Sequence, residues 1–459
     1  MVDSTLKPSR VSRQHPLAVC VAALVSITTP AIALCVAVTN CNDVGPNSLR
    51  AAVTNTLTGG IIDMTSLTCS TITLEDAQIV IPQNDLTLLG PDNRVTIAHD
   101  GNYDRVLNHQ GSGTLKLENV NVMLGNPYSA THYVTGGCIY SAGSVYLKNS
   151  SVTDCAADAN KLLAQGGGIF TIRDLTLINA TIAGNAAGTQ YSVQGEGGGA
   201  HVGGSLNAVS SSIRNNSAKG TYNSFHGGVG VYKGFSISGS TISGNSASII
   251  AGLAAIQSTG VGILDNSTIS GNHASSRIGG AYLSIPATIR NSTIAFNTAA
   301  IGKVQSYYQS PGLATGGYNA TITIDLESSI ISNNTYLSNG TMIENDFGQL
   351  SFGSGIITVA GQHNLIVASL TTFAPNVVTV TSCPLLGPLR NNGGPTQTHA
   401  LLTHSPAIDA GSNPILQEYD QRGAPYKRSD GVFANFTDIG AYEVQQEDVV
   451  FNAGFDGCP

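Results

Sequence analysis

The sequence predicts an all-β fold, a right-handed parallel β-helix, from a long internal repeat, strand-like alternation and the lack of helical periodicity. The repeated phrase is clearest as Asn266-Ser267-Thr268-Ile269-Ser270-Gly271-Asn272. Its copies begin at Asn149, Asn179, Ser210, Gly239, Asn266 and Asn291. Successive copies start 30, 31, 29, 27 and 25 residues apart. A period of about 20–50 residues is typical of solenoids, propellers and arrays, so the chain repeats one structural unit.

The stretches between the copies indicate strands rather than helices. Glycine-rich openings such as Gly166-Gly167-Gly168-Ile169-Phe170 precede most copies, and alternating runs such as Leu175-Thr176-Leu177-Ile178 follow them. Apolar and β-branched residues at period two are typical of strands with one buried face. No window of about ten residues shows an apolar stripe at helical spacing. We therefore expect about three short strands in each period, which together make one coil of the β-helix.

A column of asparagines runs through the repeats. It comprises Asn185, Asn216, Asn245, Asn272 and Asn297. On coils about 4.8 Å apart, their amides can hydrogen-bond to one another as a ladder. We also expect these asparagines to adopt the left-handed conformation at a tight bend. Triplets of the N-glycosylation type begin at Asn179, Asn266 and Asn291, but they follow from the repeat itself.

The N-terminus has the features of a secretory signal peptide over residues 1–33. Basic residues precede an apolar run over residues 17–27, and Ala31-Ile32-Ala33 offers a cleavage site after Ala33. The run is too short to span a membrane, so we expect an exported chain. Residues 34–60 are predicted to cap the solenoid, with Ser48 starting a short helix that buries Leu49, Ala52 and Val53.

The remaining boundaries follow from changes in pattern. We assign residues 61–380 to the β-helix, 381–445 to a turn-rich C-terminal segment and 446–459 to a tail. Charged residues make up only 10% of the chain and the net charge is −8, with no basic run after the first residues. This composition argues against nucleic acid as a partner.

Export makes disulfides available to the cysteines that remain after cleavage. We expect bridges between Cys41 and Cys69 and between Cys138 and Cys155. Cys458 has two interpretations, a bridge to Cys383 or an intermolecular bond. No Cys-x-x-Cys and no histidine cluster points to a metal site.

Two segments resemble known bacterial exported proteins. The glycine opening with the Asn-Ser-Thr-Ile-Ser-Gly-Asn phrase resembles right-handed β-helix proteins of the pectin-lyase-like superfamily, including polymorphic outer-membrane-protein-type repeats. The C-terminal segment resembles the choice-of-anchor domain, in stretches over residues 386–401, 405–411, 420–423 and 438–443. The stretch from Asn47 to Val53 is similar to the N-terminal cap of the same proteins. The resemblance implies a surface location rather than a chemistry, and because no hydrophobic segment follows Glu443, the route of anchoring is not predicted.

Enzyme activity is the alternative that the fold class raises, because β-helices host polysaccharide lyases and hydrolases. Those enzymes need clustered carboxylates or a basic residue beside a calcium site. Five carboxylates occur between Gly136 and Ala300, and they share no column: Asp154, Asp158, Asp174, Glu196 and Asp265. The sequence therefore favours a non-catalytic protein. If it is an enzyme, the candidates are Arg173, Glu196, His201 and Lys233.

Two further sets of residues have competing interpretations. Tyr140, Phe170 and His201 share the column after the glycine opening, and they point outward if their preceding neighbours point inward. Such a column could stack on sugar rings, or its members could stack on one another for stability. In the C-terminal segment, Asp409, Asp420, Asp438 and Glu443 are either calcium ligands or turn caps that pair with Arg422; we favour the caps and expect no cofactor.

The function that the sequence favours is adhesin-like binding of glycans or host surfaces by a secreted or cell-surface protein. A polysaccharide lyase or glycoside hydrolase with an unfamiliar site is one alternative. A purely structural envelope protein, which predicts no ligand, is the other.

Overall fold

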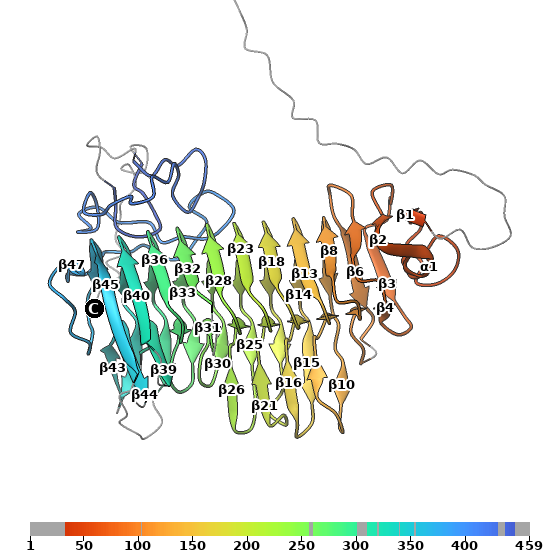
Figure 1. The fold of residues 1–459 in the computed structure, drawn as a ribbon, viewed down its shortest axis with the longest axis horizontal. Coiled ribbons are helices and arrows are strands. Elements are labelled where there is room, and N and C mark those ends of the chain that lie inside the picture. The colour runs from red at the N-terminus through yellow and green to blue at the C-terminus, as the bar shows by residue number, and fades with distance from the viewer. Residues whose placement is uncertain are drawn as a thin grey trace, which may run out of the picture.

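The protein is a parallel β-helix in the computed structural model, as the sequence predicts (Figure 1). The structure describes residues 33–101, 103–256, 260–300, 310–318, 321–338, 340–352, 355–429 and 437–445. The predicted signal peptide up to residue 32, the tail 446–459 and Cys458 lie outside the described residues. Within the described part, the strands form five sheets, which the chain visits in the order 1 to 5 in its regular coils.

Sheets 1 and 2 run the length of the solenoid. In spatial order, sheet 1 contains β1 (Ala33–Ala37), β2 (Thr56–Asp63), β5 (Leu86–Leu89), β8 (Thr114–Glu118), β13 (Ser144–Lys148), β18 (Leu175–Ile178), β23 (Leu206–Val209), β28 (Phe235–Ser238), β32 (Gly262–Asp265), β36 (Ala287–Arg290), β40 (Thr321–Glu327) and β45 (Ile356–Gln362). Sheet 2 contains β3 (Thr71–Leu74), β6 (Val95–His99), β9 (Val120–Met123), β14 (Ser151–Thr153), β19 (Thr181–Ala183), β24 (Ser212–Arg214), β29 (Thr241–Ser243), β33 (Thr268–Ser270), β37 (Thr293–Ala295), β41 (Ile330–Ser332), β46 (Asn364–Ile366) and β47 (Val378–Val380).

Sheets 3, 4 and 5 complete the coils. Sheet 3 contains β10 (Tyr128–Ser129), β15 (Ala156–Ala159), β20 (Ala186–Ala187), β25 (Ser217–Ala218), β30 (Ser246–Ala247), β34 (His273–Ala274), β38 (Thr298–Ala300), β42 (Thr335–Ser338) and β43 (Thr341–Glu344). Sheet 4 contains β11 (Val134–Thr135), β16 (Leu163–Gln165), β21 (Gln194–Glu196) and β26 (Asn223–Phe225). Sheet 5 contains β4 (Ile79–Ile81), β7 (Leu107–His109), β12 (Ile139–Ser141), β17 (Ile169–Thr171), β22 (Ala200–Val202), β27 (Val229–Val231), β31 (Leu253–Ala255), β35 (Ala281–Leu283), β39 (Leu313–Tyr318) and β44 (Phe347–Phe352).

The predicted three strands per coil hold for the first coils, up to β7, but not for the repeats: the coils from β8 to β27 have five strands and those from β28 to β39 have four. Between the asparagine ladder and the glycine opening, the chain runs outward along sheet 3 and returns along sheet 4 (Figure 1). We call this projection, residues 128–135, 156–165, 186–196 and 217–225, the fin. Its interior is small and apolar, with Ala157, Ala159 and Ala164 buried together. Alanine is a weak strand former, so these short strands have little sequence signal.

The glycine openings are required where the fin joins sheet 5. A Cβ at Gly167 would lie 2.3 Å from the backbone carbon of Ala186, and one at Gly198 would lie 2.4 Å from that of Ser217. Any side chain here would separate the base of the fin from the coil. The openings therefore allow sheet 3 to pack directly on the turn before sheet 5.

The predicted asparagine ladder is present in the core, on the bend between sheets 2 and 3. Each amide nitrogen donates to the side-chain oxygen of the next coil, from Asn185 to Asn216 at 2.9 Å and onward to Asn297. The ladder continues past the predicted members to Asn334 and ends on the carboxylate of Asp346. Because a buried backbone needs partners, each ladder oxygen also accepts from the backbone N–H of the preceding ladder residue.

The expected left-handed conformation belongs to other residues. Among the described residues with positive φ, none is a predicted ladder asparagine; the residue before each one has it, as at Gly184 (φ 70°) and Asn215 (φ 56°). A second left-handed residue starts each repeated phrase, as at Asn179 and Asn266. The ladder asparagines thus contribute their amides, whereas the preceding residue makes the bend; this residue is Gly or Asn before four of them and Phe296 before Asn297.

The N-terminal end is covered by helix α1 (Leu49–Asn55). Ser48 is its N-cap and its hydroxyl accepts from the backbone N–H of Ala51, while Leu49, Ala52 and Val53 are buried, as predicted. The disulfide Cys41–Cys69 fastens this region, and Cys138–Cys155 closes a later coil. Cys383 is also disulfide-bonded. In the described part of the chain, no helix is long and apolar enough to cross a membrane.

The C-terminal segment, residues 381–445, packs on the outer face of sheet 2 near the C-terminal end of the solenoid (Figure 1). Its core contains Arg422, which is fully buried between the rings of Tyr426 and Tyr442 and paired with Asp420 at 2.8 Å. Backbone N–H groups of Arg422 and Glu443 donate to the same carboxylate. The oxygens of Asp420 thus cap a turn and pair with Arg422, which is the interpretation that the sequence favours.

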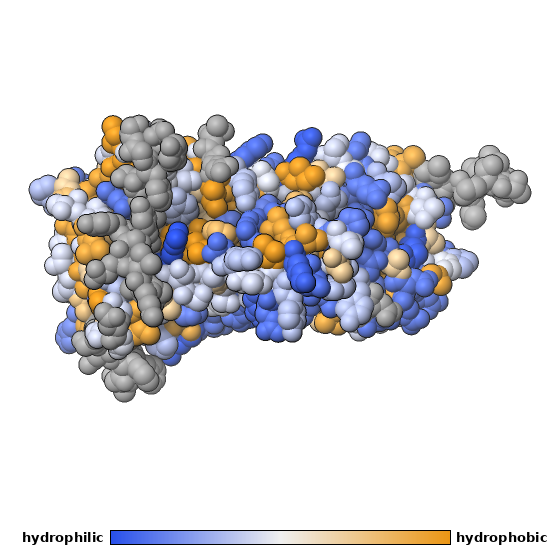
Figure 2. All heavy atoms as spheres, turned by 90° about the horizontal axis from the view of Figure 1, so that it is seen from below, coloured by the Kyte–Doolittle hydropathy of each residue, from blue (hydrophilic) through white to orange (hydrophobic). Residues whose placement is uncertain are grey.

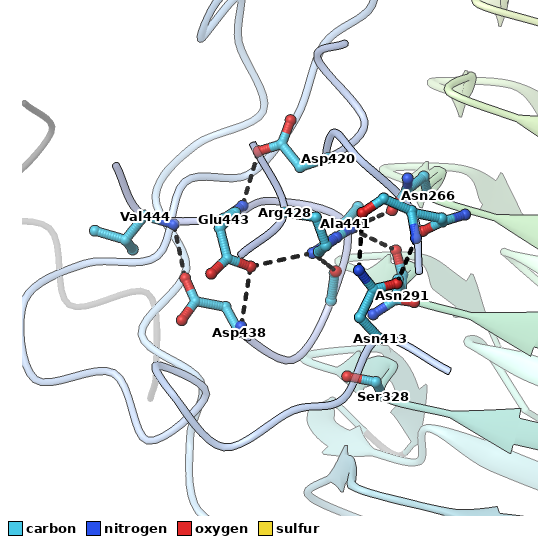
Figure 3. Close-up of polar contacts among 12 residues, drawn as sticks. Asn266, Asn291, Ser328, Asn413, Asp420, Arg428, Asp438, Ala441, Glu443 and Val444 are labelled. Atoms are coloured by element: carbon cyan, nitrogen blue, oxygen red, sulfur yellow. Dashed lines mark hydrogen bonds and ion pairs between the residues drawn. The ribbon is translucent and has the colours of Figure 1, made fainter. Parts of the chain in front are cut away.

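Arg428 links this segment to the solenoid (Figure 3). Its guanidinium donates to Asn266 Oδ1 and to the backbone oxygen of Gly440, and it lies 3.6 Å from Glu443. Burial and the neighbouring Asp438 raise the pKa of Glu443 to about 9. The amides of Asn266 and Asn291 donate to backbone oxygens of the segment. Two of the three glycosylation-type triplets, those at Asn266 and Asn291, therefore contribute to the docking interface.

Candidate functional site

The column of Tyr140, Phe170 and His201 is a stack of rings rather than an open row. These residues pair across β12, β17 and β22, with ring centroids 5.7 Å and 5.0 Å apart and planes nearly parallel. Tyr232 continues the stack, 4.8 Å beyond His201. Their neighbours Ile139, Ile169 and Ala200 point into the core, as predicted. His201 is only 7% exposed, and of the two arrangements that the sequence leaves open the structure shows the rings stacked on one another.

Glu196 and His201 are brought together but are poorly placed for proton transfer to a solvent-borne substrate. His201 Nδ1 lies 3.6 Å from Glu196 Oε2, and both side chains are largely buried. Burial lowers the pKa of His201 to about 4, so the imidazole is neutral at pH 7 and the contact is not an ion pair. Glu196 accepts hydrogen bonds from the amides of Gln165 and Gln194, which occupy its oxygens.

Arg173 and Lys233 lie apart from that pair, on the corner between sheets 5 and 1. Backbone hydrogen bonds from Gly204 to Arg173 and from Lys233 to Gly204 place them in one column, two coils apart. Both are exposed, and the ion pairs among the described residues do not connect them with Glu196 or His201. The four catalytic candidates therefore form two separate pairs, and no described contact unites them.

The outer edge of the fin carries a different set of aromatic residues. Tyr133, Tyr191 and Tyr222 are 68%, 65% and 77% exposed, each at the tip between a sheet 3 strand and a sheet 4 strand. Val193 and Leu162 lie beside them. Figure 2 views the molecule from the side of the fin and shows apolar groups set among hydrophilic ones along it. Tyrosine combines an apolar face with a polar end, which suits contact with wet, amphipathic ligands.

A groove of about 510 Å³ runs across three of these tips. It is lined by Asn160, Lys161, Gln190, Tyr191, Val193, Thr221 and Tyr222. The side chains of Asn160, Lys161 and Gln190 have no protein partner in the described part of the structure. Amide, ammonium and phenol groups thus face solvent together beside an apolar strip.

Contacts between the tips hold this edge in place. Backbone N–H groups of Lys161 and Val193 donate to Tyr191 and Leu162 on neighbouring coils, at 2.8 Å and 3.0 Å. The hydroxyl of Thr221 donates to the backbone oxygens of Gln190 and Ser192. Loops held in place in this way lose less conformational entropy when a ligand binds than free loops do.

The sequence does not predict this edge, because the aromatic column that it indicates lies next to the glycine openings. A signal was available, since Tyr191 and Tyr222 are 31 residues apart, the local period of the repeat. Without knowledge of the fin, however, neither tyrosine could be assigned to a surface.

Comparisons with known proteins add no function to what the structure shows. No family model matches the chain, and no curated protein matches it. A solved structure, pectate lyase Pel9A, is similar over 86% of this chain and 90% of its own, with 14% sequence identity and a TM-score of 0.35. At this level of similarity neither the activity nor the site of the lyase transfers.

Proposed function

We propose that this protein is a secreted or cell-surface, adhesin-like protein that binds glycans through the edge of the fin. The observation that carries the proposal is the row of exposed tyrosines with free amide and ammonium groups beside it. Tyrosine rings pack on the apolar faces of sugars, and amides exchange hydrogen bonds with their hydroxyls. The row follows the solenoid axis, so about four coils present some 15 Å of surface to a linear chain.

Two disulfides support an extracellular location, because such bonds persist in oxidising compartments. The separation of the catalytic candidates supports binding over cleavage. The proposal includes a choice-of-anchor role for the C-terminal segment, in attachment of the protein to the cell, and it leaves the route of attachment open.

The test is size-exclusion chromatography of the full chain with plant and bacterial polysaccharides. Binding predicts that protein co-elutes with glycan of unchanged length. Replacing both Tyr191 and Tyr222 by alanine should weaken retention about tenfold or more, as loss of central aromatic contacts does elsewhere. Tyr103→Ala is the matched control, because Tyr103 is 69% exposed but lies outside the groove.

Two outcomes contradict the proposal. Shortened glycan would make the protein an enzyme and direct attention to Arg173, Glu196, His201 and Lys233. Equal retention of the double variant and the Tyr103 control would remove the fin edge as the binding surface.

A further inference from the structure

The outer face of sheet 2 presents two columns rich in hydroxyl groups. One column contains Thr181, Ser212, Thr241, Thr268 and Thr293, and the other contains Arg214, Ser243 and Ser270. Residues between the two columns, such as Ile213 and Ile242, are buried in the core. A strand with one buried residue between two outward ones offers both columns to whatever covers the sheet.

The C-terminal segment covers one end of these columns and shows how they recognise polypeptide. Thr241 donates to the backbone oxygen of Gln397 at 2.7 Å, and Thr293 accepts from the backbone N–H of Ala441 at 3.1 Å. Thr268 donates to Gln421 Oε1 at 2.6 Å. Hydroxyls of sheet 2 thus replace the strand partners that an extended chain would otherwise need.

His399 marks the border of the covered region. Its Nδ1–H donates to the backbone oxygen of Gly387, which leaves Nε2 to accept from the Ser270 hydroxyl at 2.8 Å. The ring also packs on Phe296, with centroids 4.9 Å apart. Both ring nitrogens of His399 are thus engaged within the chain, while Ser270, Phe296 and His399 form the inner end of the groove described next.

Beyond the border lies a groove of about 830 Å³ between sheet 2 and the loop 388–399. On the sheet side, the side chains of Thr181, Ser212, Arg214, Asn215 and Ser243 have no hydrogen-bond or ion-pair partner in the described part of the chain. The opposite wall contains Pro388, Leu389 and Pro395, and proline has no N–H to donate. None of the described residues that line the groove is a carboxylate, and Arg214 is the charged side chain among them.

We propose that this groove binds an extended acidic polypeptide segment of a partner protein, alongside the docked C-terminal segment. The free columns are the continuation of those that already hold polypeptide, so they offer an incoming chain the same hydroxyl contacts. The apolar wall accommodates its side chains, and Arg214 forms a bidentate pair with one of its carboxylates. The site is distinct from the fin edge and does not depend on glycan binding there.

The test is fluorescence anisotropy of a labelled synthetic peptide of alternating aspartate and threonine, about a dozen residues long, with the full chain. A peptide of alternating asparagine and threonine has the same shape without the charge. The acidic peptide should bind about tenfold or more tightly than the neutral one, and Arg214→Gln should abolish that preference. Lys233→Gln is the matched control, since it removes one exposed cation from a different face.

A second variant separates binding from folding. Ser212→Phe fills the groove from an outward-facing position and should block both peptides while the melting temperature changes little. The proposal is overturned if the acidic peptide does not bind, or if Arg214→Gln and Lys233→Gln weaken it equally. It is also overturned if alginate, a carboxylate-bearing glycan, binds through Arg214 and the peptide does not.

Discussion

Two rows of aromatic residues follow the same solenoid axis, and they differ in where they sit on the coil. Tyr140, Phe170 and His201 lie on sheet 5, beside the glycine openings, and stack on one another. Tyr191 and Tyr222 lie at the fin tips, with most of their surface in solvent. Equal spacing thus produces a stabilising stack in one place and an open surface in the other.

The cause of the difference is the depth of the position within the coil. Sheet 5 is a wall of the solenoid, and its strands are spaced so that large rings in one column must touch. At the fin tips the chain reverses direction, so the tyrosine side chains splay outward, and the tips are tied together by backbone hydrogen bonds and by the Thr221 hydroxyl. The role of an aromatic residue that recurs with the repeat therefore depends on where its strand or turn lies on the coil.

The largest expected effect comes from the titration of His201, which tests whether the stack on sheet 5 is closed to water. Its folded-state pKa, about 4, lies below the unfolded value near 6.5, so the unfolded chain takes up the proton first. Stability contributed by the neutral imidazole is therefore lost as pH falls from about 6.5 toward 4. His201→Phe keeps a ring in the stack and removes this loss. The free energy of unfolding of the variant minus that of wild type should therefore be about 3 kcal/mol larger at pH 4 than at pH 7.

The measurement is the free energy of unfolding of both proteins by denaturant at the two pH values. Burial and, to a smaller degree, the neighbouring His201 lower the pKa of His226 to about 3; the effect of burial is present in both proteins and cancels from the difference. A difference that stays constant with pH would mean that His201 is open to water, and the stack would then be a candidate site again.

A smaller effect is expected from shortening the stack itself. Phe170→Ala removes a half-buried ring that contacts Tyr140 and His201, so the free energy of unfolding should fall by about 2 kcal/mol. Phe170→Leu, which keeps much of the apolar surface, should recover about half of that loss. Tyr191→Ala at the fin edge should change stability by less than about 0.5 kcal/mol. Equal losses at both positions would show that the fin edge is part of the structural core.

The sequence predicted the features that repeat and missed those that depend on one coil meeting another. The period, the alternating strands and the ladder from Asn185 to Asn297 each have a local pattern, and the helix after Ser48 has a capping signal. The end of the ladder at Asp346 has no such local pattern, because the residue that accepts the hydrogen bond there is an aspartate and not an asparagine. The fin was also invisible, since its alanines and glycines carry no strand propensity.

The candidate site was predicted less well for the same reason. The sequence names Glu196 and His201 together as candidates, but only the structure shows that the two side chains lie 3.6 Å apart and are largely buried. The groove beside Arg214 exists only because residues 388–399 fold back over sheet 2, a contact that no local pattern indicates. Contacts between residues far apart in sequence leave no trace in a single chain.

The smallest effect on stability is expected from tryptophan substitutions, whose fluorescence compares the two rows directly. The chain contains no tryptophan, so one substitution gives a single indole signal. Tyr222→Trp should leave the free energy of unfolding within about 0.5 kcal/mol of wild type and emit as a solvent-exposed indole. Because an indole stacks on sugars at least as well as a phenol, its emission should shift to the blue when glycan is added.

Phe170→Trp should emit from an apolar environment and should not respond to the same glycan. A response at position 170 without one at position 222 would reverse the roles of the two rows.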